Sequence, residues 1–213
     1  MINNITVLVD NDSWILPYAE KLVSKLTQKG KSAKLTRYHE DVEEGDVCFF
    51  LGCTKIAKEA LLNKNNHNLV VHESDLPKGK GFAPVAWQIL EGSHEIKVCL
   101  IEACNEVDSG DIWLSDVIRL SGTELSAEWR ELQGNISIEL ALRFVREYST
   151  LKAIKQSGKS TSYPRRRPND SQIDLDKSFR DLIPLLRVAD NNDYPAFFEY
   201  KGCKYKLEIS KYE

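Results

Sequence analysis

The sequence predicts an α/β fold, with a mainly parallel sheet covered by helices on both faces and a short C-terminal helix and β-hairpin extension. Short apolar segments rich in Val, Ile, Leu and Phe alternate with longer segments of helical periodicity, which is the order typical of βαβ units. The segment 46–52 (D-V-C-F-F-L-G) is almost continuously apolar, as expected of a strand covered on both faces. Two apolar runs in the tail flank Lys201-Gly202, which indicates a hairpin.

The first half of the chain alternates predicted strands and helices. Strands are expected at 5–10, 33–38, 46–52 and 69–72, and helices at 14–29, 54–63 and 82–90. The first helix has one apolar face, formed by Leu16, Ala19, Leu22, Val23 and Leu26. Gly30 and Gly92 end two of the helices, and Thr54 is expected to cap the third.

The second half continues with a strand at 95–103, an extended return at 112–120 that suits an antiparallel strand, and a long helix at 123–152. The polar segment 156–168, which contains Gly, Ser and Pro, is expected to be a loop, and a helix at 175–187 follows, disturbed near its end by Pro184. Together the elements predict a Rossmann-like domain at 1–155 and an extension at 156–213 packed on the same domain.

Composition limits the partners. The 213 residues carry a net charge of −3, so neither nucleic acid nor a membrane surface is an expected partner. No apolar run is long enough to span a bilayer, and the first residues are expected to form a strand rather than a signal peptide. The five cysteines show no metal-binding spacing, so they are interpreted as reduced core residues of a cytoplasmic protein, with a metal or disulfide role as the lesser alternative.

The residues with the clearest chemical potential follow two predicted strands. His72 ends an apolar strand, and Asp108 lies in the turn-prone sequence D-S-G after the next strand. Open α/β sheets bind ligands at the carboxyl ends of their strands. If the two strands are adjacent and parallel, their ends bring the imidazole and the carboxylate within reach. His39, His67 and His94 lack such a context and are expected to face solvent.

These motifs resemble the signature of the 10-formyltetrahydrofolate-dependent formyltransferases, which reads N-x-H-x-S-x-L-P, then R-G, a helix with a Trp, and later D-x-G. The matching positions are His72, Ser74, Leu76, Pro77, Gly81, Pro84, Trp87, Asp108 and Gly110. The segments 165–174 and 196–205 are similar to the sugar N-formyltransferase branch. The C-terminal barrel of the full methionyl-tRNA enzyme has no counterpart here, which favours an amino sugar as the acceptor.

The resemblance implies a role for each matching position. It implies that His72 and Asp108 are catalytic and that 10-formyltetrahydrofolate is the formyl donor. Contacts to this cofactor are expected from Gly52, Cys53, Ile56, Leu76, Gly110 and Asp111, mostly through the backbone, and contacts to the acceptor from Glu73, Ser74 and Lys80.

Simpler interpretations remain for several of these residues. Ser74 is equally consistent with a residue that caps a turn, and Trp87 is consistent with a residue that packs in the core. Asp111 suits a hydrogen bond within its turn, and Gly52 an ordinary strand–helix turn. The arginines at 165–167 suit either a solvated loop or a phosphate contact.

One departure from the family pattern bears directly on catalysis. Val70 stands where the family has the asparagine whose amide donates to the oxyanion, and valine has no donor. Loss of one such donor costs on the order of a hundredfold or more in rate. Asn68 lies on the same strand face but roughly 6–7 Å further back. Either His72 with a backbone or substrate group stabilises the oxyanion, or catalysis has been lost.

The sequence therefore predicts an N-formyltransferase that acts on a nucleotide-linked amino sugar, in surface polysaccharide or sialic-acid-like sugar biosynthesis. Two alternatives are a catalytically impaired folate- or nucleotide-binding protein of the same fold and a glycinamide ribonucleotide-type formyltransferase. The family habit and the apolar tail around Phe197, Phe198 and Tyr205 predict a homodimer.

Overall fold

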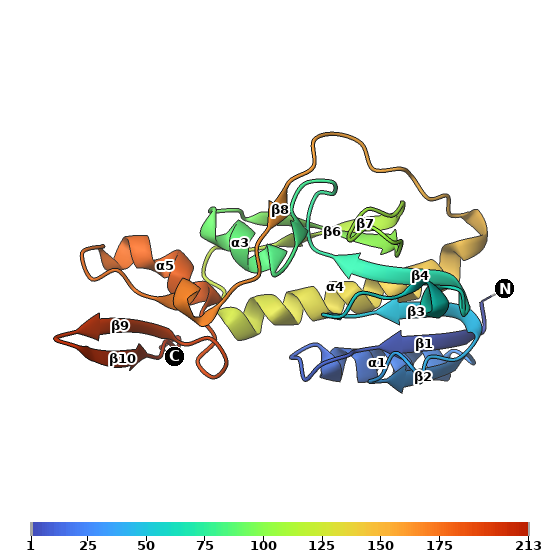
Figure 1. Cartoon of the computed structure of the whole chain (residues 1–213), viewed down its shortest axis with the longest axis horizontal. Helices are drawn as coiled ribbons and strands as arrows, with labels where there is room; N and C mark the ends of the chain where they lie inside the picture. Colours follow the sequence, from blue (N-terminus) through green and yellow to red (C-terminus); the bar gives the residue numbers. More distant parts are fainter. Residues whose placement is uncertain (1, 213) are drawn as a thin grey trace.

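The computed structural model describes residues 2–212 and is organised around one six-stranded sheet of order β2-β1-β3-β4-β6-β7 (Figure 1). The strands are β1 (Asn4–Leu8), β2 (Ser32–Thr36), β3 (Gly45–Phe50), β4 (Asn65–His72), β6 (Glu95–Glu102) and β7 (Ile112–Arg119). The first four strands of that order are parallel, whereas β6 and β7 are antiparallel to their neighbours. The α/β fold class is confirmed.

The expected parallel pairing of the strands before His72 and Asp108 is wrong. In the antiparallel pairing of β4 with β6, His72 lies opposite Cys99 and Leu69 lies opposite Glu102. The reason is the intervening helix α3 (Pro84–Leu90), whose seven residues span about 10 Å, while the eight residues of β4 span roughly 26 Å. Such a helix does not carry the chain back to the start of β4.

The helices cover the two faces of the sheet unequally. Helices α1 (Leu16–Gln28) and α4 (Ser126–Glu147) pack together on one face, where the larger apolar core lies. On the opposite face, the single helical turn α2 (Glu59–Leu62) lies over a small cluster of Leu8, Val42, Cys48, Phe50 and Leu61. Thr54 does not cap this helix, because the helix begins only at Glu59 and its N-cap residue is Lys58. The Thr54 N–H donates to Asp10.

The C-terminal extension forms a small core of its own. Helix α5 (Phe179–Val188) and the hairpin β9 (Ala196–Tyr200)–β10 (Cys203–Leu207) enclose Ile173, Leu182, Leu186, Ala189 and Ala196. The hairpin turns at Lys201-Gly202, both at positive φ, as predicted. Figure 1 shows it projecting at the end of the molecule opposite the chain's first residues.

One short strand pairing completes the fold. After α4 and a 3₁₀ turn at Tyr148–Thr150, the chain returns along the sheet, and β8 (Ser162–Tyr163) pairs with β5 (Lys80–Gly81). No helix within residues 2–212 has both the length and the apolar character needed to cross a membrane.

The contact between α1 and α4 depends on Gly134. A Cβ at this position would lie 2.4 Å from the ring of Tyr18 on α1. In an exposed helix, Gly→Ala is worth roughly 1 kcal/mol of stabilisation. We expect Gly134→Ala to lower the free energy of unfolding by about 1–3 kcal/mol instead, because the methyl group overpacks the interface. Urea denaturation checks this, and Tyr18→Ala in the same background should remove the penalty.

Candidate functional site

The structure brings His72 and Asp108 together. His72 is the last residue of β4 and only 5% exposed, and its Nδ1 lies 3.6 Å from Oδ1 of Asp108. Its Nε2 lies 2.8 Å from the carbonyl oxygen of Gly79, which can only accept, so Nε2 carries the proton in this contact. Protonation of Nδ1 as well would create an ion pair with the Asp108 carboxylate.

The loop formed by residues 79–81 closes over this pair. While Gly79 accepts from His72, the Gly81 N–H donates to Oδ2 of Asp108 at 2.8 Å. The loop is fixed from outside, because Gly79 N–H donates to Oγ1 of Thr161 and Gly81 is paired with Tyr163. Gly81 has φ +97°, and a Cβ there would lie 2.5 Å from the Tyr163 carbonyl oxygen, so a side chain does not fit.

Asp108 reaches His72 from a loop that folds back along the sheet. The side-chain amide of Gln156 donates to the carbonyls of both Asp108 and Gly110, at 2.9 Å each. An added Cβ on Gly110 would lie 1.7 Å from the carbonyl oxygen of Glu102, so only glycine fits there. Sequence reasoning missed Gln156, Thr161 and Tyr163 because they lie in a polar segment with no periodic pattern.

The three predicted acceptor contacts surround the pair in different ways. Lys80 donates to Oγ of Ser109 and lies 3.6 Å from Glu106, so it flanks the Asp108 loop. The Ser74 hydroxyl is buried without a hydrogen-bond partner among residues 2–212. Glu73 accepts from Nε2 of Gln133 at 2.7 Å, and burial raises the pKa of its carboxyl group.

The predicted cofactor contacts are spread over the core and two surface loops. Leu76 packs into a small cluster with Cys99 and Ile101. Gly52 and Ile56 are exposed, and the Cys53 thiol donates to the Leu8 carbonyl, with burial raising its pKa to about 12. The Asp111 carbonyl accepts from the N–H of Glu102 at the end of β6, so its observed hydrogen bond lies across the loop between β6 and β7.

The loop that contains Gly52, Cys53 and Ile56 is anchored by Asp10, just beyond the end of β1. The Asp10 carboxylate accepts from the backbone N–H groups of Thr54 and Lys55 at 2.8 and 2.9 Å. It also accepts from Asn11 and lies 3.1 Å from Nε2 of His39. Burial alone would raise the pKa of Asp10, but these hydrogen bonds outweigh burial and lower the pKa to about 2.

Asp10→Asn tests this anchor. Because the folded-state pKa of Asp10 lies below its ordinary value of 3.8, the stabilisation is present above pH 3.8 and is lost as the pH falls toward 2. We expect the variant to lose about 2 kcal/mol of unfolding free energy at pH 7. Its deficit relative to wild type should shrink between pH 4 and pH 2, as measured by urea denaturation. Asp12→Asn, at an exposed neighbouring carboxylate, is the matched control.

Two of the other three histidines do not simply face solvent, contrary to the prediction. His39 is half-buried against Asp10, and His67 contacts Glu102 and the hydroxyl of Tyr148 at 3.1 and 2.8 Å. Only His94 is exposed as predicted. Sequence context gave no sign of these partners, which lie far away along the chain. Within residues 2–212, no three His, Cys, Asp or Glu side chains are grouped as a metal site.

The structure shows what surrounds Val70 and whether Asn68 is free to act in place of the family's asparagine. Its side chain packs between two apolar clusters, beside Cys48 on one side and Leu76 on the other. The Asn68 amide donates to the Leu62 carbonyl at 2.7 Å. Asn68 is therefore engaged elsewhere and does not replace the family's asparagine, as predicted from its distance along the strand.

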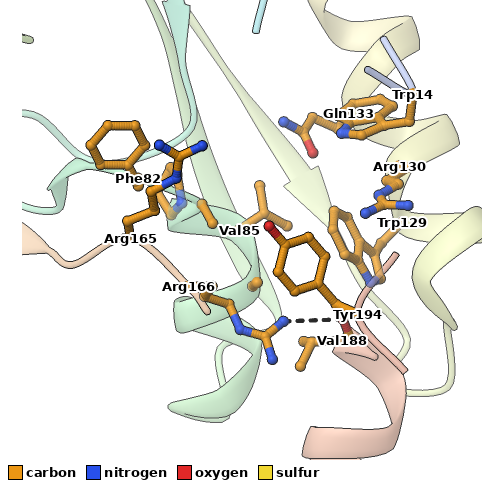
Figure 2. Close-up of a pocket in the computed structure, with 13 residues that line it drawn as sticks. Trp14, Phe82, Val85, Trp129, Arg130, Gln133, Arg165, Arg166, Val188 and Tyr194 are labelled. Atoms are coloured by element: carbon orange, nitrogen blue, oxygen red, sulfur yellow. Dashed lines mark hydrogen bonds between the residues drawn. The ribbon is translucent and has the colours of Figure 1, made fainter. Parts of the chain in front are cut away.

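A separate pocket lies between α3, α4 and the segment around residue 165 (Figure 2). Neither His72 nor Asp108 lines it, although Gln133 does, and Gln133 is bonded to Glu73. Three arginines, at 130, 165 and 166, lie around the pocket together with Trp14, Trp129, Phe82 and Tyr194. The pocket thus combines positive charge with aromatic surface, and no carboxylate lines it.

Comparison with known proteins places the chain among the relatives of formyltransferases. No protein-family model matches the sequence. The methionyl-tRNA formyltransferase of Orientia tsutsugamushi is 26% identical over 171 residues, which cover 79% of this chain and 55% of that protein. The chain therefore spans about half the length of the curated relatives it matches.

The fold is that of solved formyltransferases. Methionyl-tRNA formyltransferase from Clostridium thermocellum superposes with a TM-score of 0.83 at 19% identity, over 100% of this chain and 94% of that one. A 4-N formyltransferase from Francisella tularensis gives 0.74 at 18% identity, over 99% and 98%. HypX from Aquifex aeolicus, in complex with tetrahydrofolic acid, gives 0.80 at 16% identity, over 98% and 38%. The resemblance to the formyltransferases is confirmed.

Proposed function

We propose that this protein transfers a formyl group from 10-formyltetrahydrofolate to the amino group of a nucleotide-linked amino sugar. The observation that carries the proposal is the meeting of His72 and Asp108, residues far apart in the sequence, at the positions that the family motif assigns to catalysis. The curated relatives and the structural neighbours support the reaction class.

The reaction asks for groups that this site contains. The acceptor amine attacks the formyl carbon, giving a tetrahedral oxyanion, and the bond between that carbon and N10 of the folate then breaks. One proton leaves the amine and one reaches N10, so a paired imidazole and carboxylate suit the transfer. An imidazolium held by Asp108 also stabilises the oxyanion electrostatically, which Val70 does not.

The residues expected to bind the donor offer the kinds of groups that a pterin needs, namely main-chain polar groups and apolar side chains. Main-chain groups of the loop that Asp10 anchors are expected to pair with the pterin edge, and the exposed apolar side chains of Ile56 (69%) and Val107 (51%) offer surface for its rings. 10-Formyltetrahydrofolate, when bound, supplies the formyl group. The HypX neighbour solved with tetrahydrofolic acid supports this choice of donor.

An amino sugar is favoured over methionyl-tRNA as the acceptor by two features. The segment 165–174 resembles the sugar branch, and two of its arginines line the pocket beside the site. The net charge of −3 does not favour a large polyanion. Methionyl-tRNA is the second candidate, favoured by the names of the curated relatives.

Formyl transfer by variants of the pair tests the proposal. We expect His72→Asn and Asp108→Asn each to lower the rate at least a hundredfold, because each removes a group that moves a proton or stabilises charge. The assay follows formamide formation by mass with the formyl donor and a panel of nucleotide-linked 3- and 4-amino sugars, with methionyl-tRNA in parallel. His94→Asn is the control, since His94 is exposed and lies outside the site. Full activity in His72→Asn would reject the catalytic assignment.

Substitutions at Val70 distinguish a working enzyme from an impaired binding protein of the same fold. We expect Val70→Asn, which adds an amide donor, to raise the rate by tenfold or more, whereas Val70→Ala should not. The polar side chain should also cost about 1–3 kcal/mol of stability in this apolar position, measurable by urea denaturation. A lower rate in Val70→Asn would mean that the site is built around an apolar residue. Folate binding without turnover on any amine would favour the impaired protein.

A further inference from the structure

A second cavity lies at the end of the molecule where the described chain begins, opposite the C-terminal hairpin (Figure 1). It is formed between the end of α1, the end of α4 and the 3₁₀ turn that follows α4, and we call it the α1–α4 cavity. Its volume of about 580 Å³ lies within the range of about 300–1,000 Å³ that is common for small-molecule sites. Neither His72 nor Asp108 lines it, so it is separate from the candidate catalytic pair.

One wall of the α1–α4 cavity is apolar. Ile2 and Leu26 are buried there, and Leu142 and Val145 are half-buried along α4. Water molecules against such a wall find few hydrogen-bond partners. Replacing them with an alkyl chain is favourable, because apolar surface is removed from water on both sides of the contact.

The charged residues that line the α1–α4 cavity are all cations, namely Lys29, Lys31 and Arg146. Within residues 2–212, neither lysine forms an ion pair with a carboxylate, and Lys31 Nζ donates only to the carbonyl of Ile2, at 2.7 Å. Arg146 is already paired with Glu147, so it contributes less free charge. The lining therefore carries two positive charges that no acidic side chain balances.

The end of α1 does not account for these two lysines. Lysine side chains near a helix C-terminus often bond the last carbonyls of the helix. Here the carbonyl of Leu26 accepts from the N–H groups of Lys29 and Lys31 at 3.0 and 3.1 Å, and that of Thr27 accepts from Gly30 at 2.9 Å. Because the backbone satisfies these carbonyls, the lysine side chains are not needed to cap the helix.

From these features we infer that the α1–α4 cavity binds an amphipathic monocarboxylate, with its alkyl chain against the apolar wall and its carboxylate beside Lys29 and Lys31. A neutral alkyl chain would leave both lysines without a counter-ion, and a small anion would leave the apolar wall in water. The net charge of −3 does not favour an anionic membrane surface as the source of the carboxylate. The inference goes beyond the proposed function and does not rest on it.

Tyr148 gives the α1–α4 cavity a spectroscopic reporter. This tyrosine lines the cavity, and its hydroxyl lies 2.8 Å from Nε2 of His67, whose Nδ1 lies 3.1 Å from Glu102. A ligand beside Tyr148 should therefore shift the imidazole signals of His67 in a nuclear magnetic resonance spectrum. His39 and His94 do not line the cavity, so their signals serve as internal references.

The test is calorimetric titration of the full chain with decanoate below its critical micelle concentration. Decanol, decylammonium and acetate are titrated in parallel, because they lack the charge, reverse its sign or lack the chain. We expect decanoate to bind saturably and at least tenfold more tightly than each of the other three. The bound decanoate should shift the imidazole signals of His67 and leave those of His39 and His94 unchanged.

Lysine variants test the charged part of the site. Lys29→Met and Lys31→Met should each weaken decanoate binding about tenfold, because each removes a charge-assisted contact and keeps an apolar stem. Lys25→Met is the matched control, since Lys25 is in the last turn of α1 but does not line the cavity. Thermal unfolding of each variant is measured in parallel, and the exposed Lys29 gives a variant that leaves the fold undisturbed.

Three results would overturn the inference. The first is absence of saturable decanoate binding, or equal binding by wild type and both lysine variants. The second is loss of decanoate binding in Arg166→Gln or His72→Asn, because neither residue lines the α1–α4 cavity. The third is binding of the chain to phosphatidylglycerol vesicles without binding of monomeric decanoate. Failure of formyl transfer to every amine would reject the proposed function alone, and decanoate binding would still support the inference.

Discussion

The candidate site depends on one piece of backbone that binds two side chains at once. The loop from Gly79 to Gly81 accepts a hydrogen bond from His72 through its first residue and donates one to Asp108 through its last. The imidazole and the carboxylate are thereby held 3.6 Å apart, although His72 ends β4 and Asp108 lies in the loop between β6 and β7. Thr161 and Tyr163 hold the loop from the other side, so the return segment after α4 is as necessary to the pair as the strands are.

The same loop joins two regions of different chemistry. On one side it covers the His72–Asp108 pair, and on the other it continues into Phe82, which lines the pocket together with the arginines at 130, 165 and 166. The last residue of β4 and the residue after it contact different regions. His72 contacts Gly79, whereas Glu73 contacts Gln133 on α4. One region thus holds an imidazole and a carboxylate, and the other holds arginines and aromatic rings. Asp10 gives the loop that contains Gly52 and Cys53 an anchor comparable to the one that Thr161 gives the loop from Gly79 to Gly81.

The protein satisfies the buried charges of Asp10 and Arg166 to different extents. At Asp10, hydrogen bonds from backbone, amide and imidazole groups satisfy the carboxylate within the protein, so it acts as structure. At Arg166, the guanidinium keeps a buried N–H without a partner among residues 2–212. An unpaired buried donor costs free energy, so the Arg166 guanidinium is less fully satisfied within the protein than the Asp10 carboxylate is.

The sequence by itself determined the fold class, the hairpin turn and the identity of the central pair. Alternating periodicity reports which elements form, and His72 and Asp108 stand in local motifs that are visible without coordinates. Only the tertiary structure decided the antiparallel direction of β6, because strand direction depends on how far α3 carries the chain. It also revealed Asp10, Gln156 and Thr161, whose partners are distant in sequence and leave no periodic signal. Local patterns determine elements, whereas long-range hydrogen bonds and the path of connecting segments determine which side chains meet.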